Sequence, residues 1–410
     1  MQKFFEGKRF HYIAVFLIAA ATLIVYSNTF NASFHFDDKP HIIENYNLRS
    51  LKNVPAILVG HRGVTMATFA LNYAVGGLNV VGYHIVDTVI HMVNGILVYL
   101  LIFFTLNIFQ GSRGEVDGVW SKRIAIYSSL LFVVHPIQTQ TVTYIIQRME
   151  SLASLFYLLA LLFFIKGSRA STRTKRFFLY GGVTASYILG FYSKEIAITI
   201  PAVILLYDLY FISEGGIKGI LSRWPLYSIL TLLLLFFIAK TLVPLGGFGD
   251  VSEASAGFSV KAISPIEYLF TQFNVLFYYI LLLIVPLNQS VDYDFPISKG
   301  LFEIPSVSDG TILNIPIPPP IVSLVILLAI IGFAICLFIR RGTYSTQRAR
   351  AVSFFILWFF IILFPTSSFI PIMDVIFEHR LYLASVGFFV IFAIIFDGLF
   401  SWLGKRRKRA

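Results

Sequence analysis

Charged residues are scarce in this sequence. Only 13% of its 410 residues are Asp, Glu, Lys or Arg, whereas 57% are hydrophobic. A soluble domain carries about 25% charged residues, and the mean hydropathy of +0.79 is far on the apolar side. The composition therefore excludes a soluble globular protein, and the loops are too short to hold a separate soluble domain.

Cysteine and acidic residues are also few. The single cysteine, Cys336, lies in an apolar run, which excludes an internal disulfide. The 21 acidic residues are outnumbered by 32 basic ones, giving a net charge of +11. The basic residues cluster in short tails and loops such as "KGSRASTRTKR" and "KRRKRA". This is the positive-inside pattern of membrane proteins, so we reject a nucleic-acid partner.

Long apolar runs make up most of the sequence between the basic loops. A transmembrane helix needs about 20 apolar residues, and long unbroken runs exclude a barrel. We therefore predict an all-α polytopic membrane protein with about 10–11 transmembrane helices in one domain, 1–410. Helices are expected at about 11–27, 83–106, 122–136, 150–166, 177–193, 195–212, 224–243, 321–339, 352–369 and 381–402.

The basic loops also predict the orientation. Lys3, Lys8 and Arg9 hold the N-terminus in the cytoplasm, so residues 31–82 form a long first extracytoplasmic loop with interfacial helices. Residues 245–320 form a late extracytoplasmic region. The apolar segment 266–287 within it is expected to be re-entrant, because a full crossing would put about ten Lys and Arg residues on the wrong side.

In this topology the unusual polar residues gather on the extracytoplasmic side. Polar residues near a bilayer are costly, so their grouping is informative. The plainer alternative is that each is a solvated loop residue, but together they occur at nearly every outer turn. The candidate site residues are Asp37, Asp38, Arg62, His135, Arg148, Glu150, Lys194, Glu195, Asp292, Glu378, Arg380 and Tyr382.

The adjacent acids Asp37 and Asp38 are the catalytic candidates. A carboxylate can take a proton from a hydroxyl nucleophile, and two neighbouring acids repel, which raises one pKa or helps to hold a divalent metal. The plain alternative is a helix cap or a loop acid. His84, Asp87 and His91 share one helical stripe, but no third clear ligand accompanies the histidines. We assign no metal residues, and a divalent metal stays an open option.

The cations are candidates for binding an anionic leaving group, because charge-assisted hydrogen bonds to phosphate are about twice as strong as neutral ones. Lys194 interrupts two apolar helices and needs a partner, which is either Glu195 or another acid, or a lipid phosphate. His135 either binds a phosphate or sugar hydroxyl or caps a broken helix. The predicted phosphate-binding residues are Lys194, Arg148, Arg62 and Arg380.

These groups suggest one reaction, in which a hydroxyl or amide attacks a sugar carried on a lipid phosphate. The ordered motifs "FHFDDKPHIIENYNLR", "HPIQTQTVTYIIQRMES", "YSKEIAITIPAVILLYDL", "VDYDFP" and "EHRLYLAS" resemble the membrane domain of the transmembrane and tetratricopeptide-repeat O-mannosyltransferases and their bacterial relatives. More widely, the chain is similar to the GT-C superfamily of polyprenyl-phosphate-sugar-dependent glycosyltransferases. The resemblance runs from about residue 30 to 390.

The resemblance implies a GT-C fold with a catalytic acid in the first outer loop, which is Asp37 by motif, with Asp38 beside it. It implies that Lys194 and Arg148 face the carrier phosphate, and that Glu378, Arg380 and Tyr382 form the late motif. Ala384 stands where the family usually has proline, and Asp87 where it often has asparagine. The tetratricopeptide repeats expected after such a domain are missing before the chain stops at "KRRKRA".

The resulting hypothesis is an inverting membrane glycosyltransferase. It transfers a monosaccharide, mannose by resemblance, from a polyprenyl-phosphate carrier to a hydroxyl of a protein or other acceptor on the extracytoplasmic side. The alternatives are a transporter or flippase for lipid-linked sugar, and a non-catalytic member of a glycan assembly complex. The expected location is a bacterial inner membrane with the site facing the periplasm, or alternatively the endoplasmic reticulum with the site lumenal.

Overall fold

The computed structural model of the protein describes residues 7, 9–108, 118–245, 257, 260, 262–305, 317–339 and 345–407. Part of the predicted region 245–320 therefore lies outside the described residues. The longer helices are α2 (Arg9–Tyr26), α5 (Val80–Asn107), α7 (Gly118–Val134), α9 (Arg148–Ser168), α10 (Arg173–Phe191), α13 (Trp224–Leu245), α14 (Pro265–Ile284), α15 (Pro320–Ile339), α16 (Ser345–Leu363) and α17 (Leu381–Arg407).

Short helices connect these long ones. Five of them are η4 (Pro136–Gln138), α8 (Thr139–Thr143), η5 (Ile145–Gln147), η6 (Glu195–Thr199) and η8 (Glu378–Arg380). The predicted site residues lie in or close to these short helices in several cases, such as Glu195 in η6 and Glu378 in η8. A broken helix of η6, α11 (Ile200–Tyr207) and η7 (Asp208–Ile212) is followed by α12 (Ile217–Leu221). The segment between α2 and α5, called the first outer loop after its predicted placement, holds η1 (Lys39–Ile43), η2 (Tyr46–Arg49), η3 (Leu51–Asn53), α3 (Val54–Val59) and α4 (Gly63–Gly76).

The fold is that of an all-α polytopic membrane protein, as the sequence predicts. The described residues contain no strand, and eight helical segments among them are long and apolar enough to cross a membrane. Three further helices, α7, α10 and α16, have 17, 19 and 19 residues. The helix bounds agree closely with the apolar runs, because a helix that is buried or faces lipid must be apolar along its whole length.

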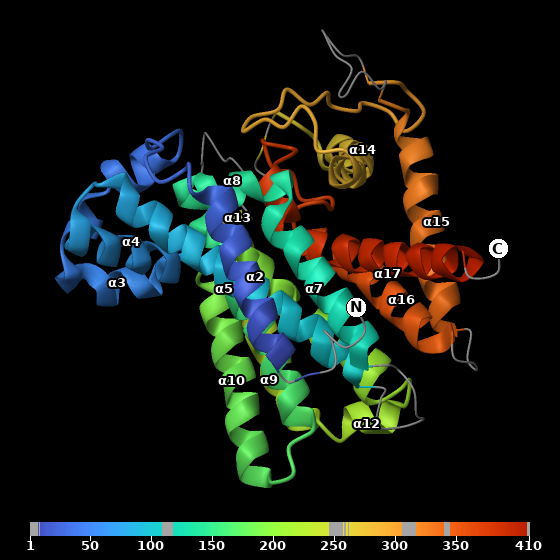
Figure 1. The fold of residues 1–410 in the computed structure, drawn as a ribbon. Helices are drawn as coiled ribbons and strands as arrows, with labels where there is room; N and C mark the ends of the chain where they lie inside the picture. The colour runs from blue at the N-terminus through green and yellow to red at the C-terminus, as the bar shows by residue number, and fades with distance from the viewer. Residues whose placement is uncertain are drawn as a thin grey trace.

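The first outer loop forms a helical lobe beside the bundle, with α3 and α4 at its far side (Figure 1). The corner between α3 and α4 is tight. Arg62 takes a left-handed backbone with φ of 51°, and a side chain on Gly63 would lie 2.3 Å from the carbonyl oxygen of Ile57. This corner turns the start of α4 back toward the bundle, where Val64 donates its N–H to the carbonyl of Tyr192 at 3.0 Å.

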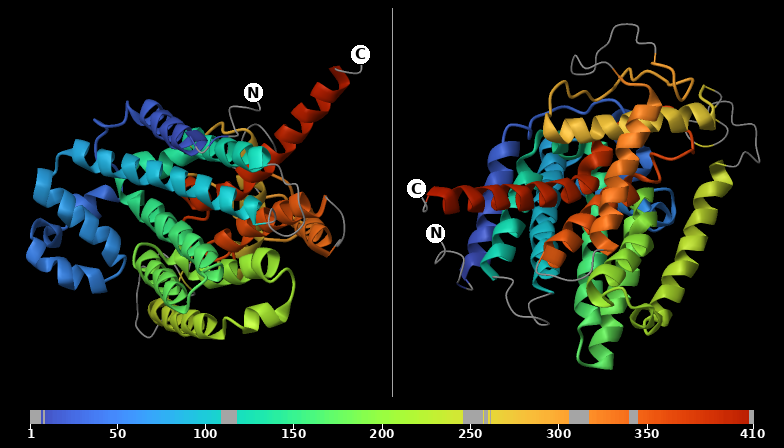
Figure 2. Two further views of the ribbon diagram at one scale, coloured as in Figure 1. Left: turned by 60° about the horizontal axis from the view of Figure 1, so that its bottom comes forward. Right: turned by 90° about the vertical axis from the view of Figure 1, so that its right-hand side faces the viewer.

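Helix α14 lies across one end of the bundle (Figure 2, right), above helices that run lengthwise in the same view. Its side chains hold the segment before η8. Gln272 donates to the carbonyl of Val375 at 2.9 Å, and Tyr279 donates to that of Phe377 at 2.8 Å. The helix is long and apolar enough to span a membrane. Its re-entrant placement relative to the membrane stays a prediction.

A buried ion pair joins α5 to α9. The guanidinium of Arg148 donates from Nε to Asp87 at 2.5 Å, and both side chains are buried, at 0% and 1% exposure. Arg148 also donates to Asn72 at 2.6 Å and to the carbonyl of Tyr83 at 3.0 Å, and it lies over the ring of Phe69. Burying a charge is tolerated only with such pairing, so this cluster fixes the outer lobe onto the bundle.

We expect Asp87→Ala to lower the melting temperature in detergent much more than Asp87→Asn does. Removing one partner of a buried pair costs about 3–5 kcal/mol, whereas the amide oxygen of asparagine can still accept from Arg148. Thermal unfolding followed by tryptophan fluorescence checks this. Equal melting temperatures for the two variants would contradict the assigned role of the pair.

Candidate functional site

The predicted site residues lie at one end of the helical bundle. Asp37 follows the end of α2, His135 the end of α7, and Lys194 the end of α10, while Glu150 lies in the first turn of α9. The basic segments at the start of α7 and between α9 and α10 lie at the other helix ends. The alternation of helix directions therefore collects the acids and the proposed anion-binding cations on the same side.

The two adjacent acids have opposite environments. Asp38 is 1% exposed, and its carboxylate accepts the backbone N–H groups of His35 at 3.0 Å and Ile146 at 2.7 Å. Burial raises the pKa of Asp38 to about 6, against the opposing effect of these two hydrogen bonds. Asp37 is exposed, and no Lys, Arg or His of the described residues forms an ion pair with its carboxylate. Asp38 therefore anchors the loop, and Asp37 is the acid that can meet a substrate.

Lys194 lies between α10 and η6 and points at the start of α9. Its ammonium forms an ion pair with Glu150 Oε2 at 2.7 Å and donates to Gln147 Oε1 at 3.3 Å. The side chain of Lys194 is 11% exposed and that of Glu150 is 1% exposed. Burial lowers the pKa of Lys194, and the charge of Glu150 opposes this change. Two of the three ammonium hydrogens are thus used by these partners.

A second ion pair lies next to Lys194. Arg62 Nη2 and Glu195 Oε2 are 3.0 Å apart, and Arg62 Nε donates to both carboxylate oxygens at 3.2 and 3.3 Å. His61 Nε2 lies 2.7 Å from Glu195 Oε1. Arg62 remains 29% exposed, so the pair has one side open to the surroundings.

The late motif completes the group. Arg380 donates to the carbonyl oxygens of Asp374 at 2.7 Å and Val375 at 3.1 Å. His379 donates to Gln140 Oε1 from its backbone N–H at 2.7 Å and from ring Nδ1 at 3.1 Å, and its ring lies within electrostatic reach of Lys194, Arg380 and Arg62. The three cations therefore share one neighbourhood although they come from three separate segments.

Two further acids belong to this region. Burial raises the pKa of Asp374, and the charge of Arg380 opposes that change, while the charges of Asp292 and Asp37 add to it. Asp292 is exposed, and its loop is held by Glu378, which accepts from Gln289 at 2.6 Å and from the N–H of Ser290 at 2.9 Å. The late loops thus bring exposed carboxylates into the neighbourhood of Asp37.

Several predicted residues hold the fold. Arg148 uses Nε, Nη1 and Nη2 on protein partners and is fully buried. The hydroxyl of Tyr382 accepts from Asn94 at 3.0 Å and lies 2.7 Å from His91 Nδ1, joining α17 to α5. His135 Nδ1 accepts the N–H of Ile137 at 3.2 Å, as expected of a residue that caps a broken helix.

The described residues show no group of three or more His, Cys, Asp or Glu side chains that could hold a metal ion. The residues of the α5 stripe are each bound to a different partner. His84 contacts the carbonyl of Ala32 at 2.9 Å, Asp87 binds Arg148, and His91 contacts Tyr382.

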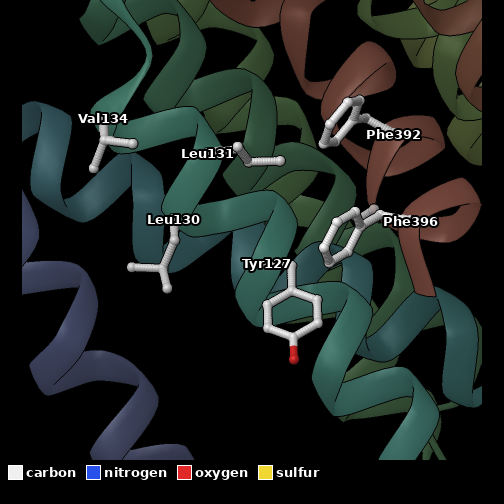
Figure 3. Close-up of a pocket in the computed structure, with 7 residues that line it drawn as sticks. Tyr127, Leu130, Leu131, Val134, Phe392 and Phe396 are labelled. Carbon is white, nitrogen blue, oxygen red and sulfur yellow. The ribbon is translucent and has the colours of Figure 1, made fainter. Parts of the chain in front are cut away.

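An apolar recess of about 310 Å³ lies between α7 and α17 (Figure 3). The close-up shows Leu131, Phe392 and Phe396 along its walls. Its lining is almost wholly hydrocarbon, so it offers no group for acid–base or phosphate chemistry. Such a recess is expected where two lipid-facing helices diverge.

The structure adds site residues that sequence reasoning did not select. Tyr144 accepts the N–H of Asp37 at 2.9 Å, Gln147 accepts from Lys194, and Asp374 carries one of the exposed carboxylates. Tyr144 and Gln147 stand in the same quoted motif as Arg148. Both are polar residues that lie shortly before the start of α9, and this position is the only feature of the sequence that could have indicated them.

Comparison with known proteins gives relatives of one kind. The chain is 33% identical over 256 residues to protein O-mannosyl-transferase TMTC2 of Homo sapiens, covering 56% of this chain and 28% of the relative. It is 26% identical over 232 residues to TMTC4 of Homo sapiens, covering 51% and 31%. It is 26% identical over 404 residues to protein O-mannosyl-transferase F38B6.6 of Caenorhabditis elegans, covering 93% and 51%.

The matched part thus spans about a quarter to a half of the length of these relatives. No family model matches the chain, and no solved structure matches it. The chain resembles the protein O-mannosyl-transferases, which confirms the resemblance that its motifs indicate.

We expect the extra stability of wild type over Asp38→Asn to decline as the pH rises from about 4 to about 7. The folded-state pKa of Asp38 is raised to about 6 from 3.8, so the acid favours the folded state most when both states are protonated and loses this contribution as pH passes the folded pKa. A shift of this size corresponds to about 3 kcal/mol. Melting temperatures of both proteins in detergent across this pH range test it, and a difference independent of pH would rule it out.

Proposed function

We propose that this protein is a membrane glycosyltransferase that moves a monosaccharide from a polyprenyl-phosphate carrier to a hydroxyl group of a protein. Mannose is the proposed sugar, because the relatives are protein O-mannosyl-transferases. The observation that carries the proposal is that Asp37, an exposed carboxylate without an ion pair among the described residues, lies at the same end of the membrane bundle as Lys194, Arg62 and Arg380.

In the proposed reaction the Asp37 carboxylate takes the proton of the acceptor hydroxyl. The hydroxyl oxygen then forms a bond to the anomeric carbon while the bond from that carbon to the carrier phosphate oxygen breaks. The bonding electrons leave with the lipid phosphate. Attack opposite the leaving group inverts the configuration of the sugar. Positioned general bases contribute about 10²–10⁴-fold to such steps.

The leaving phosphate is assigned to Lys194, Arg62 and Arg380. Lys194 keeps an ammonium hydrogen beyond its bonds to Glu150 and Gln147, and Arg62 has an open side. Arg148 is left out of this set because its donors are bound to the α5 and α4 segments. Fixed cations beside the developing negative charge stabilise the transition state.

We place the site on the extracytoplasmic face, because the basic segments lie at the opposite helix ends. A bacterial inner membrane with the site in the periplasm is the proposed location, and the endoplasmic reticulum with a lumenal site is the equivalent arrangement in a eukaryote. A polyprenyl-phosphate sugar reaches such a site from within the membrane. The acceptor reaches it from the aqueous side, where Asp37 is exposed.

We expect Asp37→Asn to reduce sugar transfer by about 10²-fold or more, because the amide cannot accept the hydroxyl proton. The assay follows labelled polyprenyl-phosphate mannose with a serine- and threonine-containing peptide in detergent. Glu44→Gln is the matched control, since Glu44 is an exposed acid of the same loop. Wild-type turnover in Asp37→Asn would remove Asp37 from the role of base.

We expect Lys194→Met to raise the KM for the lipid donor by about 10- to 100-fold, the loss of one charge-assisted hydrogen bond worth about 1.5–3 kcal/mol. The single variant leaves Glu150 buried without its partner, so the double variant Lys194→Met with Glu150→Gln separates folding from binding. Melting temperature should recover in the double variant while the KM stays high. Lys52→Met, an exposed lysine of the outer loop, serves as the control, and recovery of donor affinity in the double variant would refute the phosphate role.

A further inference from the structure

The segment Tyr144–Gln147 touches three of the residues discussed above. Its backbone closes a single turn, in which Gln147 donates its N–H to the carbonyl of Tyr144 at 2.9 Å. Ile145 and Ile146 are buried at 0% and 1% exposure, so the turn is anchored in the protein. Its polar groups then reach outward to the first outer loop on one side and to Lys194 on the other.

The first contact is to the base. Tyr144 Oη accepts the backbone N–H of Asp37 at 2.9 Å, and the same hydroxyl lies within electrostatic reach of the Asp37 carboxylate. The ring of Tyr144 meets the ring of Phe36 edge-on, with centroids 6.4 Å apart. Phe36 has a φ of 40°, a left-handed conformation that costs a non-glycine residue about 1–2 kcal/mol. A strained residue of this kind persists only where its neighbours hold it.

The second and third contacts lie on the next residues of the turn. Asp38 Oδ1 accepts the N–H of Ile146 at 2.7 Å, which fixes the loop beside the base. Gln147 is 4% exposed, and its Oε1 accepts from the ammonium of Lys194 at 3.3 Å. Consecutive residues therefore hold the proton acceptor and the phosphate-binding ammonium from one rigid piece of backbone.

We propose that Tyr144 and Gln147 are positioning residues, which set the placement of Asp37 and Lys194 relative to each other through the 144–147 turn. This inference rests on the proposed function. A base and a leaving-group cation must act on the same sugar at the same moment, and misplacement of about 1 Å can cost about 10²-fold in rate. Holding both from one turn removes the independent motions that two separate loops would have.

The hydroxyl of Tyr144 is suited to this role. Burial, together with the charges of Asp37 and Asp38, raises the pKa of Tyr144, so the hydroxyl keeps its proton and can donate it to a carboxylate. The groups that face Asp37 are Asp38 of its own loop, Tyr144 of the turn and Asp374 of the late loop. Tyr144 is the one among these three that brings no negative charge beside the base.

The test compares Tyr144→Phe with Gln147→Met in the full chain in detergent. Tyr144→Phe removes only the hydroxyl, and we expect kcat to fall about 10-fold or more with little change in the KM for labelled polyprenyl-phosphate mannose. Gln147→Met should instead raise the donor KM and leave kcat little changed.

Hydrogen exchange gives a second readout that needs no catalysis. In Tyr144→Phe the amides of residues 34–40 should exchange faster than in wild type, since the N–H of Asp37 loses its acceptor. Tyr46→Phe is the matched control, because Tyr46 is exposed and packs its ring against Arg49. Unchanged exchange in Tyr144→Phe, or equal changes of kcat and KM in both turn variants, overturns the positioning role.

A failure of the proposed glycosyltransferase function can be distinguished from a failure of the positioning role. If wild type transfers no sugar from the lipid donor, the proposed function fails, and the exchange of residues 34–40 still decides whether Tyr144 holds the Asp37 loop. If wild type is active and Tyr144→Phe matches it in kcat and exchange, the proposed function stands and the positioning role is lost.

Discussion

A charge that leaves water must find a partner inside the protein, and this requirement arranges the outer end of the bundle. Arg148 pairs with Asp87, Lys194 with Glu150, and Arg62 with Glu195. In each pair the two residues come from different segments, so neutralising a charge also joins two parts of the chain. The helices are apolar enough to pack in many ways in a membrane, where the hydrophobic effect gives little preference among helix pairs. The ion pairs supply the specific register at the end where chemistry is proposed.

The same requirement separates residues that hold the structure from residues that are free to act. Asp37 and Asp38 are neighbours of the same type, yet Asp38 turns inward and accepts two backbone N–H groups, while Asp37 stays exposed. Glu378 likewise uses its carboxylate to hold the loop that carries Asp292. A polar group whose bonds are all satisfied has nothing left for a ligand. We therefore propose the Asp37 carboxylate, which forms no ion pair with a described residue, as the chemically active group of this end.

The sequence predicts the helices well and the site in part. Apolar runs define α5 and α9 to within a few residues, because lipid and core both require the same composition. The collection of polar residues on one side follows from the alternation of basic loops. The pairings do not follow, since Asp87 and Arg148 are 61 positions apart and nothing local links them. For the same reason a single sequence does not indicate Tyr144 and Gln147 as site residues, because their role depends on the residues that they contact in the folded protein.

The charge balance of the site bears on how the proposed reaction would be driven. Lys194, Arg62 and Arg380 all lie within electrostatic reach of His379. Glu150 and Glu195 are the ion-pair partners of two of them, so Arg380 is the one of these three that forms no ion pair with a described residue. A phosphodiester-linked sugar donor brings one negative charge, whereas the lipid phosphate that departs carries up to two. Water is scarce around these largely buried side chains, so their field is weakly screened. In the proposed reaction these cations therefore stabilise the departing phosphate more than the donor, and the difference lowers the barrier as the bond to the sugar breaks.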